Sequence, residues 1–230
     1  MDVQTALDSV RPKSGLSPRI WDDGKLRPEI ANALDRIAQR WLKELELELD
    51  VEDIILTGSY AGRTWGPGSD LDLHIIVDMG ASKDPEALQR ATKLAKFKWE
   101  EEHDVTIMGI PVEVYVEDID EDPPEATGRW SITRNEWVLE PTEGGAAFDE
   151  SKVVKKVMDF REVIRRAREA HSEGSLMAAM KRITKMRKAG LELGGELSGE
   201  NLAYRVLRRT GELQQARDEI HDIIDRDLSI

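Results

Sequence analysis

The segment from Gly58 to Asp72 combines residue types that together bind phosphate groups and divalent cations. Gly58 and Ser59 follow a short apolar run, and backbone N–H groups at such a turn, beside a small hydroxyl, bind anions. Asp70 and Asp72 are two residues apart, so on a strand their carboxylates point to the same face. Two adjacent carboxylates repel each other unless a cation lies between them, and Mg²⁺ favours carboxylate and phosphate oxygens. The spacing therefore predicts a metal site beside a phosphate site.

A third carboxylate is expected from a neighbouring strand. In the run from Ile110 to Glu117, valines occupy alternate positions and leave Glu113 and Tyr115 on the opposite face. A glutamate among valines is out of place unless its face is polar or binds a metal, so Glu113 is the expected third ligand. Glu117 shares that face near the end of the strand and is the alternative.

The elements that must position these residues follow from the spacing of apolar side chains. Residues 1–26 are rich in Pro, Gly, Ser and charge, and we expect an extended arm there. Apolar residues three and four apart predict a helix from Pro28 to about Leu49. Strands or hairpins are expected at 53–57, 71–77, 105–116 and 130–139, and a further helix at 85–102.

The stretch from Pro141 to Ala147, with Gly144 and Gly145, is the clearest linker, and helical spacing continues beyond it. The sequence therefore predicts two domains. Residues 1–147 form a catalytic core with the N-terminal arm and helix, and residues 148–230 form a C-terminal helical bundle.

Composition restricts the class of protein. The 230 residues are 40% apolar and contain no cysteine, which excludes disulfides, thiolate metal sites and cysteine nucleophiles. No apolar run is long enough to cross a bilayer, and the N-terminus lacks the apolar stretch of a secretory signal, so a cytoplasmic protein without membrane contact is expected. The net charge is −13, yet residues 151–210 hold 15 Lys and Arg against 7 Asp and Glu. Such a segment attracts polyanions, or it is a solvated helix face.

The order of an apolar residue, Gly-Ser, a spacer and Asp-apolar-Asp-apolar resembles the nucleotidyltransferase superfamily that includes DNA polymerase β. Here 11 residues, Ser59 among them, lie between Gly58 and Asp70, and this spacing is usual in that family. Glu113 matches the third acid of the family, and the resemblance covers about residues 50–117. It implies an α+β fold, with a polymerase-β-like core of a short mixed sheet and helices, followed here by the C-terminal helical bundle.

The resemblance also implies a reaction, the transfer of a nucleoside monophosphate from an NTP, ATP included, to an acceptor with release of pyrophosphate. Asp70 and Asp72 would then bind two Mg²⁺ or Mn²⁺ ions. Glu113 would hold the catalytic ion and help to deprotonate the acceptor, and Gly58 and Ser59 would hold the triphosphate.

Four further residues are predicted to contact the nucleotide. Arg63 lies in the loop between the Gly-Ser turn and the Asp pair, and Ser69 directly precedes that pair. Lys185 and Arg209 lie in the basic segment 151–210, where solvated helix faces are the alternative. The tryptophan-containing hairpin, the Ser-Asp-Leu-Asp-Leu-His run and the C-terminal part also look like nucleotidyltransferases encoded by tailed bacteriophages, a resemblance that leaves the acceptor open.

The function we expect is thus a metal-dependent, template-independent nucleotidyltransferase, because little chain remains for a domain that holds a duplex. The sequence leaves open whether the acceptor is RNA or tRNA, a protein or a small molecule. It also leaves open the oligomeric state, the base preference and the biological role. One alternative is a catalytically silent module of the same fold that senses nucleotides. Another is a toxin or immunity enzyme that modifies a protein or tRNA through the same site.

Overall fold

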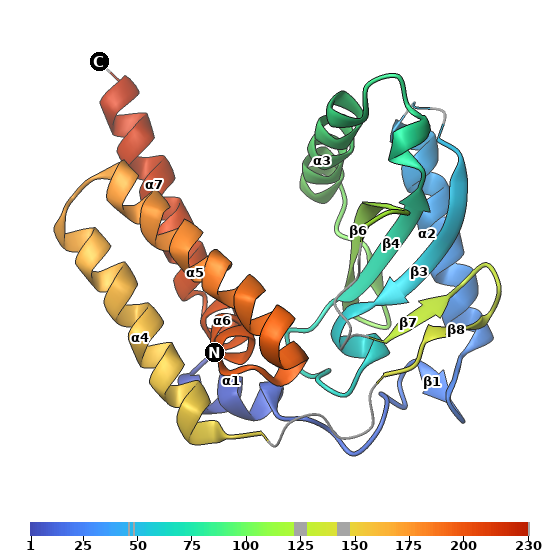
Figure 1. The fold of residues 1–230 in the computed structure, drawn as a ribbon, viewed down its shortest axis with the longest axis horizontal. Coiled ribbons are helices and arrows are strands. Elements are labelled where there is room, and N and C mark those ends of the chain that lie inside the picture. The colour runs from blue at the N-terminus through green and yellow to red at the C-terminus, as the bar shows by residue number, and fades with distance from the viewer. Residues whose placement is uncertain (46, 48, 122–127, 142–147, 230) are drawn as a thin grey trace. The chain divides into compact units, whose positions relative to one another are not determined.

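The structure, a computed structural model, describes residues 1–45, 47, 49–121, 128–141 and 148–229. They fall into two compact units (Figure 1). The sheet unit comprises Lys13–Pro123 and Thr127–Glu143, and the helical unit is formed chiefly by Met1–Pro12 and Gly144–Ile230. Each unit has its own hydrophobic core.

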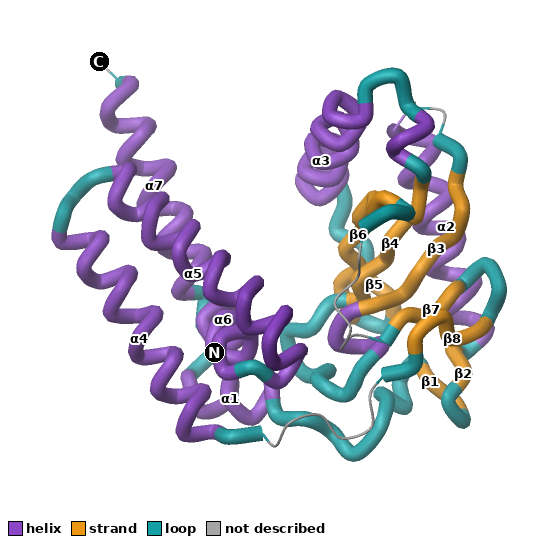
Figure 2. Tube along the Cα trace, in the orientation of Figure 1, coloured by secondary structure: helices purple, strands orange, loops and turns teal. Residues whose placement is uncertain are grey.

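The sheet unit is built on six strands in the order β5-β6-β4-β3-β7-β8 (Figure 2). The strands are β3 (Val51–Thr57), β4 (Leu71–Val77), β5 (Thr106–Ile107), β6 (Ile110–Asp118), β7 (Arg129–Ser131) and β8 (Glu136–Leu139). Among these, β4 and β6 pair in parallel and the other neighbours pair antiparallel. Parallel neighbours need a crossover connection, which α3 (Pro85–Glu102) supplies between β4 and the β5–β6 hairpin.

The two faces of the sheet differ in chemistry because side chains alternate along each strand. Leu71, Leu73 and Ile75 of β4 are fully buried. They share a core with the apolar side of α2 (Pro28–Leu45), which contributes residues such as Leu34 and Trp41. The opposite face of β4 carries Asp72 and His74, so this strand has its polar side chains on the side away from this core.

Local sequence explains where the helices of this unit begin. Asp84 caps α3 by accepting a hydrogen bond from the Ala87 N–H at 2.9 Å, and Pro85 occupies the first turn, where its missing N–H costs nothing. The predicted bounds of α3 and β4 are confirmed. The helix that begins at Pro28 ends at Leu45, about one turn earlier than predicted.

In its described residues, the helical unit contains five α-helices and a short 3-10 turn. The helices are α1 (Val3–Val10), α4 (Glu150–Glu169), α5 (Glu173–Gly194), α6 (Gly199–Arg209) and α7 (Glu212–Leu228), and the turn is Gly195–Leu197. The short α6 is buried along most of its length and contacts α1, α4 and α5. Its Leu202 and Leu207 pack in one core with Phe160 of α4 and Ile183 of α5.

The predicted extended arm at residues 1–26 is wrong. Residues 3–10 form α1, whose Ala6, Leu7 and Val10 are buried against the core of the helical unit. Such a short helix is stabilised by packing rather than by its own propensity. Further along, β1 (Trp21–Asp22) and β2 (Lys25–Leu26) form a small hairpin.

The fold is therefore α+β, a short mixed sheet with helices followed by a helical region, as the sequence predicts. No helix among the described residues is long and apolar enough to cross a membrane. Residues 142–147, most of the predicted linker, lie outside the described residues. The division of function between residues 1–147 and 148–230 stays a prediction.

Candidate active site

Three carboxylates meet at one end of the parallel strand pair. Asp72 of β4 lies opposite Glu113 of β6 in the strand register, and Asp70 directly precedes β4. One carboxylate oxygen from each of the three lies within 4.8 Å of the other two. The structure thus brings together the three acids that the sequence singles out, and their oxygens are hard ligands of the kind that Mg²⁺ and Mn²⁺ prefer.

The Gly-Ser turn lies directly against this carboxylate cluster. Strand β3 ends at Thr57, which is opposite Asp72, and the chain then turns through the 3-10 helix η1 (Gly58–Ala61). Gly58 has φ +72°, a conformation that favours glycine. A Cβ at this position would lie 1.7 Å from Oδ2 of Asp72, so a side chain here would displace the carboxylate. Both the positive φ and the close approach of Asp72 therefore require glycine at position 58.

The buried hydroxyl of Ser59 is placed as expected for a residue that binds a phosphate. The residue is only 8% exposed, and its hydroxyl oxygen has no hydrogen-bond partner among the described residues. A buried polar group without a partner costs about 1–3 kcal/mol. A phosphate oxygen would accept from this hydroxyl, so the turn and the acids together fit a nucleotide phosphate with divalent cations.

Glu113 is held by two neighbours that sequence analysis did not assign to the site. The Tyr115 hydroxyl donates a hydrogen bond to Oε2 of Glu113, and Nζ of Lys96 on α3 lies 3.5 Å from the same oxygen. Burial and then the neighbouring Asp70 raise the pKa of Glu113 above its usual range, so negative charge is crowded here. Alternation along β6 already places Tyr115 on the face of Glu113, but nothing in the sequence aims Lys96 at it.

Glu117, the alternative third ligand, is engaged elsewhere. It accepts hydrogen bonds from Arg129 Nη2 at 2.8 Å and Nη1 at 3.3 Å, and it contacts Nδ1 of His74 at 2.5 Å. Burial opposes ionisation of Glu117, but the hydrogen bonds from His74 and Arg129 outweigh it and lower its pKa. Glu117 and Arg129 are each 8% exposed, so they form a buried ion pair with His74 beside it. Geometry therefore favours Glu113 over Glu117 as the acid that joins the aspartates.

The remaining predicted nucleotide contacts have varied surroundings. Ser69 is buried, and its hydroxyl accepts a hydrogen bond from the Gly66 N–H at 3.2 Å, which fixes the loop before the aspartates. In the helical unit, Lys185 is exposed on α5, and Arg209 of α6 donates a hydrogen bond to Ser9 of α1. Their contact with a nucleotide stays a prediction.

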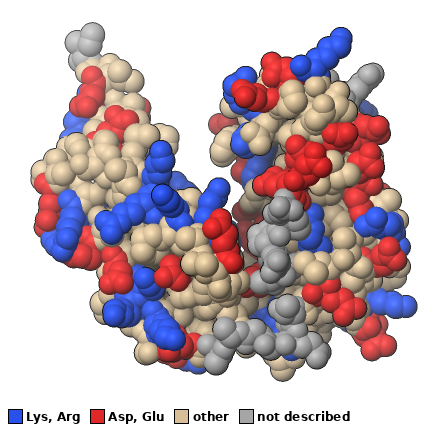
Figure 3. All heavy atoms as spheres, viewed as in Figure 1, with Lys and Arg blue, Asp and Glu red and all other residues tan. Residues whose placement is uncertain are grey.

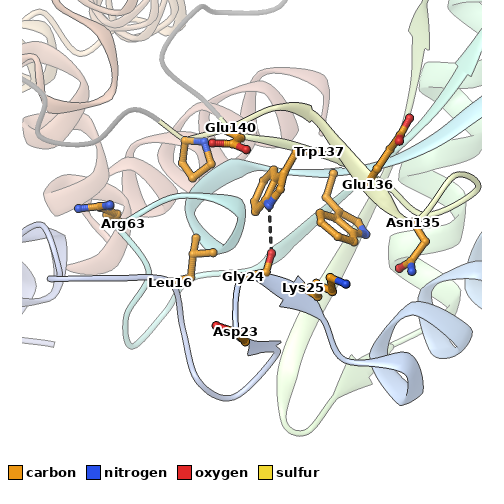
Figure 4. A pocket seen from close by; sticks show the side chains of 11 residues that line it. Leu16, Asp23, Gly24, Lys25, Arg63, Asn135, Glu136, Trp137 and Glu140 are labelled. Carbon is orange, nitrogen blue, oxygen red and sulfur yellow. Dashed lines mark hydrogen bonds between the residues drawn. The ribbon is translucent and has the colours of Figure 1, made fainter.

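Arg63 lines a separate cavity of about 630 Å³ in the sheet unit (Figure 4). Figure 4 shows Arg63 at one end of this cavity and Asn135 with Glu136 at the other. The Trp137 indole N–H donates to the Gly24 carbonyl at 3.0 Å and joins the two hairpins along its wall. The described residues that line the cavity do not include Asp70, Asp72 or Glu113, the three acids of the carboxylate cluster. Whether Arg63 contacts a nucleotide stays a prediction.

A comparison with known protein families agrees with the architecture. Residues 34–135 match the family model described as the nucleotidyltransferase domain, a segment that contains the Gly-Ser turn and all three clustered carboxylates. Together with the mixed sheet and the helices that follow it, this match confirms the predicted fold class and supports the nucleotidyltransferase superfamily.

Among solved structures, the chain is similar to the cyclic dinucleotide synthase CdnE of Elizabethkingia meningoseptica, determined with GTP and Apcpp. The alignment covers 94% of this chain and 86% of that one, with 13% sequence identity and a TM-score of 0.30. No curated protein sequence matches the chain.

Proposed function

We propose that this protein is a metal-dependent nucleotidyltransferase that moves a nucleoside monophosphate from an NTP to an acceptor without a template, releasing pyrophosphate. The observation that carries the proposal is the convergence of Asp70, Asp72 and Glu113 within 4.8 Å, against the Gly58 turn. The match of residues 34–135 to the nucleotidyltransferase domain supports it.

Asp70 and Asp72 would hold the divalent cations, two ions in the proposed arrangement, with Glu113 as the third ligand of one. Bound there, the cations supply charge neutralisation for the leaving pyrophosphate and activation of the attacking hydroxyl. Glu113 would accept the proton of that hydroxyl, and the Tyr115 hydroxyl and the Lys96 ammonium keep its carboxylate oriented toward the aspartates. Burial, then Glu113 and Asp72, raise the pKa of Tyr115, which therefore stays protonated and able to donate.

Gly58 and Ser59 would hold the triphosphate. The Gly58 backbone allows close approach of a phosphate because no Cβ projects toward Asp72. The buried Ser59 hydroxyl, which lacks a partner among the described residues, would donate to a phosphate oxygen. These interactions orient the α-phosphate for in-line attack, which is the main work that a protein does in phosphoryl transfer.

The test is pyrophosphate release from each of the four NTPs with Mg²⁺ or Mn²⁺, in the presence of cell lysate as a source of acceptors. Asp70→Asn with Asp72→Asn should abolish release, whereas Asp120→Asn, which removes an exposed carboxylate of the same unit, should leave it unchanged. Equal release by wild type and the double variant would overturn the proposal. Tight NTP binding without product would instead favour a silent nucleotide-sensing module.

The acceptor is to be identified by transfer of label from α-³²P-labelled NTPs. Labelled species in the lysate separate into RNA, protein and small molecules, which distinguishes the acceptor classes in one experiment. A labelled protein or tRNA would favour a toxin or immunity enzyme. A phage origin and a cytoplasmic location remain predictions from the sequence.

A further inference from the structure

The exposed side of α5 carries a stripe of four cations, Lys181, Arg182, Lys185 and Lys188, here called the α5 basic stripe. All four residues are exposed. At 3.6 residues per turn they occupy about a third of the helix circumference and extend over roughly 10 Å of its axis. Figure 3 shows Lys and Arg side chains gathered over this part of the helical unit.

The stripe cations differ from several arginines of α4, which pair with acidic side chains. On α4, Arg161 pairs with Glu212, Arg165 pairs with Glu162 and Glu169, and Arg168 pairs with Glu219. Among the described residues, none of the four stripe cations has an ion pair or hydrogen bond from its side chain. The concentration of positive charge on α5 is thus uncompensated in a chain whose net charge is −13.

Neither packing nor helix stability explains why cations occupy these four positions of α5. The apolar side of α5, with Leu176, Ala179 and Ile183, is already buried in the helical unit. Arg187, next to Lys188 in sequence but on another side of the helix, shows the contrast, because its guanidinium lies 4.5 Å from the ring centroid of Tyr204 and donates to Asn201. Repulsion between unpaired cations three and four residues apart destabilises a helix slightly. An anionic partner would relieve it.

We propose that the α5 basic stripe binds the phosphate backbone of a single-stranded nucleic acid. Lys181, Lys185 and Lys188 of the stripe lie nearly along one line of the helix, which suits one strand of regularly spaced phosphates. A membrane surface fits poorly, since insertion needs an apolar face and that of α5 is buried. No aromatic side chain lies among the four residues, so binding involves the backbone and tolerates any base sequence.

The binding itself is independent of nucleotidyl transfer, and only the further step, that the bound strand is the acceptor, rests on the proposed function. Loss of catalysis in the Asp70→Asn with Asp72→Asn variant must therefore leave strand binding intact. This separates a failure of the stripe from a failure of the active site.

The test is fluorescence anisotropy of the full chain with labelled 12-nucleotide oligo(U) and oligo(dT), titrated between 50 and 200 mM salt. Three to four phosphate contacts predict that affinity falls on the order of 20- to 50-fold over this range. The variant Lys181→Gln with Lys185→Gln and Lys188→Gln should lose binding at least tenfold and flatten the salt dependence. A control with Lys152→Gln, Arg165→Gln and Arg166→Gln removes three cations from α4, each paired with an acid, and should bind as wild type.

Replacing the three lysines by arginine should preserve binding, and circular dichroism should show equal helix content in all variants. If the glutamine variant does not fold, single Lys185→Gln, with about a fivefold loss of affinity expected, decides instead. Absence of binding at 50 mM salt, equal loss in the α4 control, or stronger binding to anionic vesicles of phosphatidylserine than to either oligonucleotide would each overturn the proposal.

Discussion

The ammonium of Lys96 lies 3.5 Å from Oε2 of Glu113 and 3.9 Å from the ring centroid of Tyr115. One cation from the crossover helix thus contacts both the third carboxylate of the cluster and the tyrosine that donates to it. The Lys96 side chain is 17% exposed, so its charge is only partly screened by water. Lys96 also pairs with Glu100 one turn along α3, so its positive charge is shared between that acid and the acidic cluster.

Lys96→Met should tighten Mn²⁺ binding by about 3- to 10-fold, because it removes a positive charge that repels a dication in the cluster. Electron paramagnetic resonance of free Mn²⁺ measures this affinity directly. Lys98→Met, on the same helix but 73% exposed and 3.9 Å from Glu102, is the matched control and should have no effect. Weaker Mn²⁺ binding by Lys96→Met would show instead that its main effect is to hold Glu113 in place.

Glu113→Gln and Glu117→Gln should separate the acid of the active site from the structural one. Glu113→Gln should reduce nucleotidyl transfer at least 100-fold with little loss of stability, since it removes a ligand and a proton acceptor. Glu117→Gln should lower the free energy of unfolding by about 3 kcal/mol, because it leaves Arg129 buried without its carboxylate. Urea unfolding and pyrophosphate release measure the two effects. The reverse pattern would identify Glu117 as the third ligand.

Gly58→Ala should reduce nucleotidyl transfer, and Gly24→Ala separates backbone strain from the displacement of Asp72 as the cause. Both glycines have positive φ, +72° and +73°, so both substitutions carry a similar backbone penalty of about 1–2 kcal/mol. Only at Gly58 does the added Cβ meet Asp72, whereas nothing lies within 4 Å at Gly24. Activity measured at a temperature where both variants are folded should fall more than tenfold for Gly58→Ala alone. Similar losses in both would contradict a specific role of the close approach.

The ion pair between Arg161 and Glu212 predicts a pH dependence of stability in the helical unit. Burial raises the pKa of Glu212, but the hydrogen bonds from Arg161 and Thr210 outweigh it, and the net pKa is lowered. The pair therefore stabilises the fold fully above the unfolded pKa of about 4.3 and progressively less as pH falls through the lowered folded value. Glu212→Gln should destabilise the protein at pH 7 and have a smaller effect at pH 3.

The free energy of unfolding of both proteins by urea at the two pH values measures this dependence. Glu86→Gln is the control, because Glu86 is 87% exposed and lies 3.9 Å from Arg90, an arrangement worth little in water. A difference between Glu212→Gln and wild type that does not shrink at low pH would contradict the prediction.

Local sequence was sufficient for the parts of the fold in which propensity and pattern agree. Helix α3 has its cap at Asp84 and a proline in its first turn, and β4 is an apolar run whose first half alternates with polar residues, so both were predicted to the residue. The first helix was missed because α1 depends on burial of Leu7 and Val10 by distant residues. The hairpin of β1 and β2 was missed although Asp23-Gly24, a favoured two-residue turn, stands between its strands.

In the candidate site too, local pattern predicts some of the contacts and misses others. Alternation along two strands predicts that Asp72 and Glu113 share a face, and the parallel register places them side by side. Apart from Tyr115 on the same strand, the partners of Glu113 and of the neighbouring Glu117 come from other elements. Lys96 reaches Glu113 from α3, and Arg129 reaches Glu117 from β7. Such contacts depend on tertiary packing, which spacing along one element does not specify.

Because α1 packs in the helical unit while the sheet unit lies between α1 and α4 in the chain, the helical unit is discontinuous in sequence. On the ribosome, α1 emerges before α6, the helix it packs on, which follows almost 190 residues later. At ~5–20 residues per second this separates the two helices by about 10–40 s. The sheet unit therefore has time to fold before the helical unit can close, and during that interval the apolar side of α1 is exposed to chaperones.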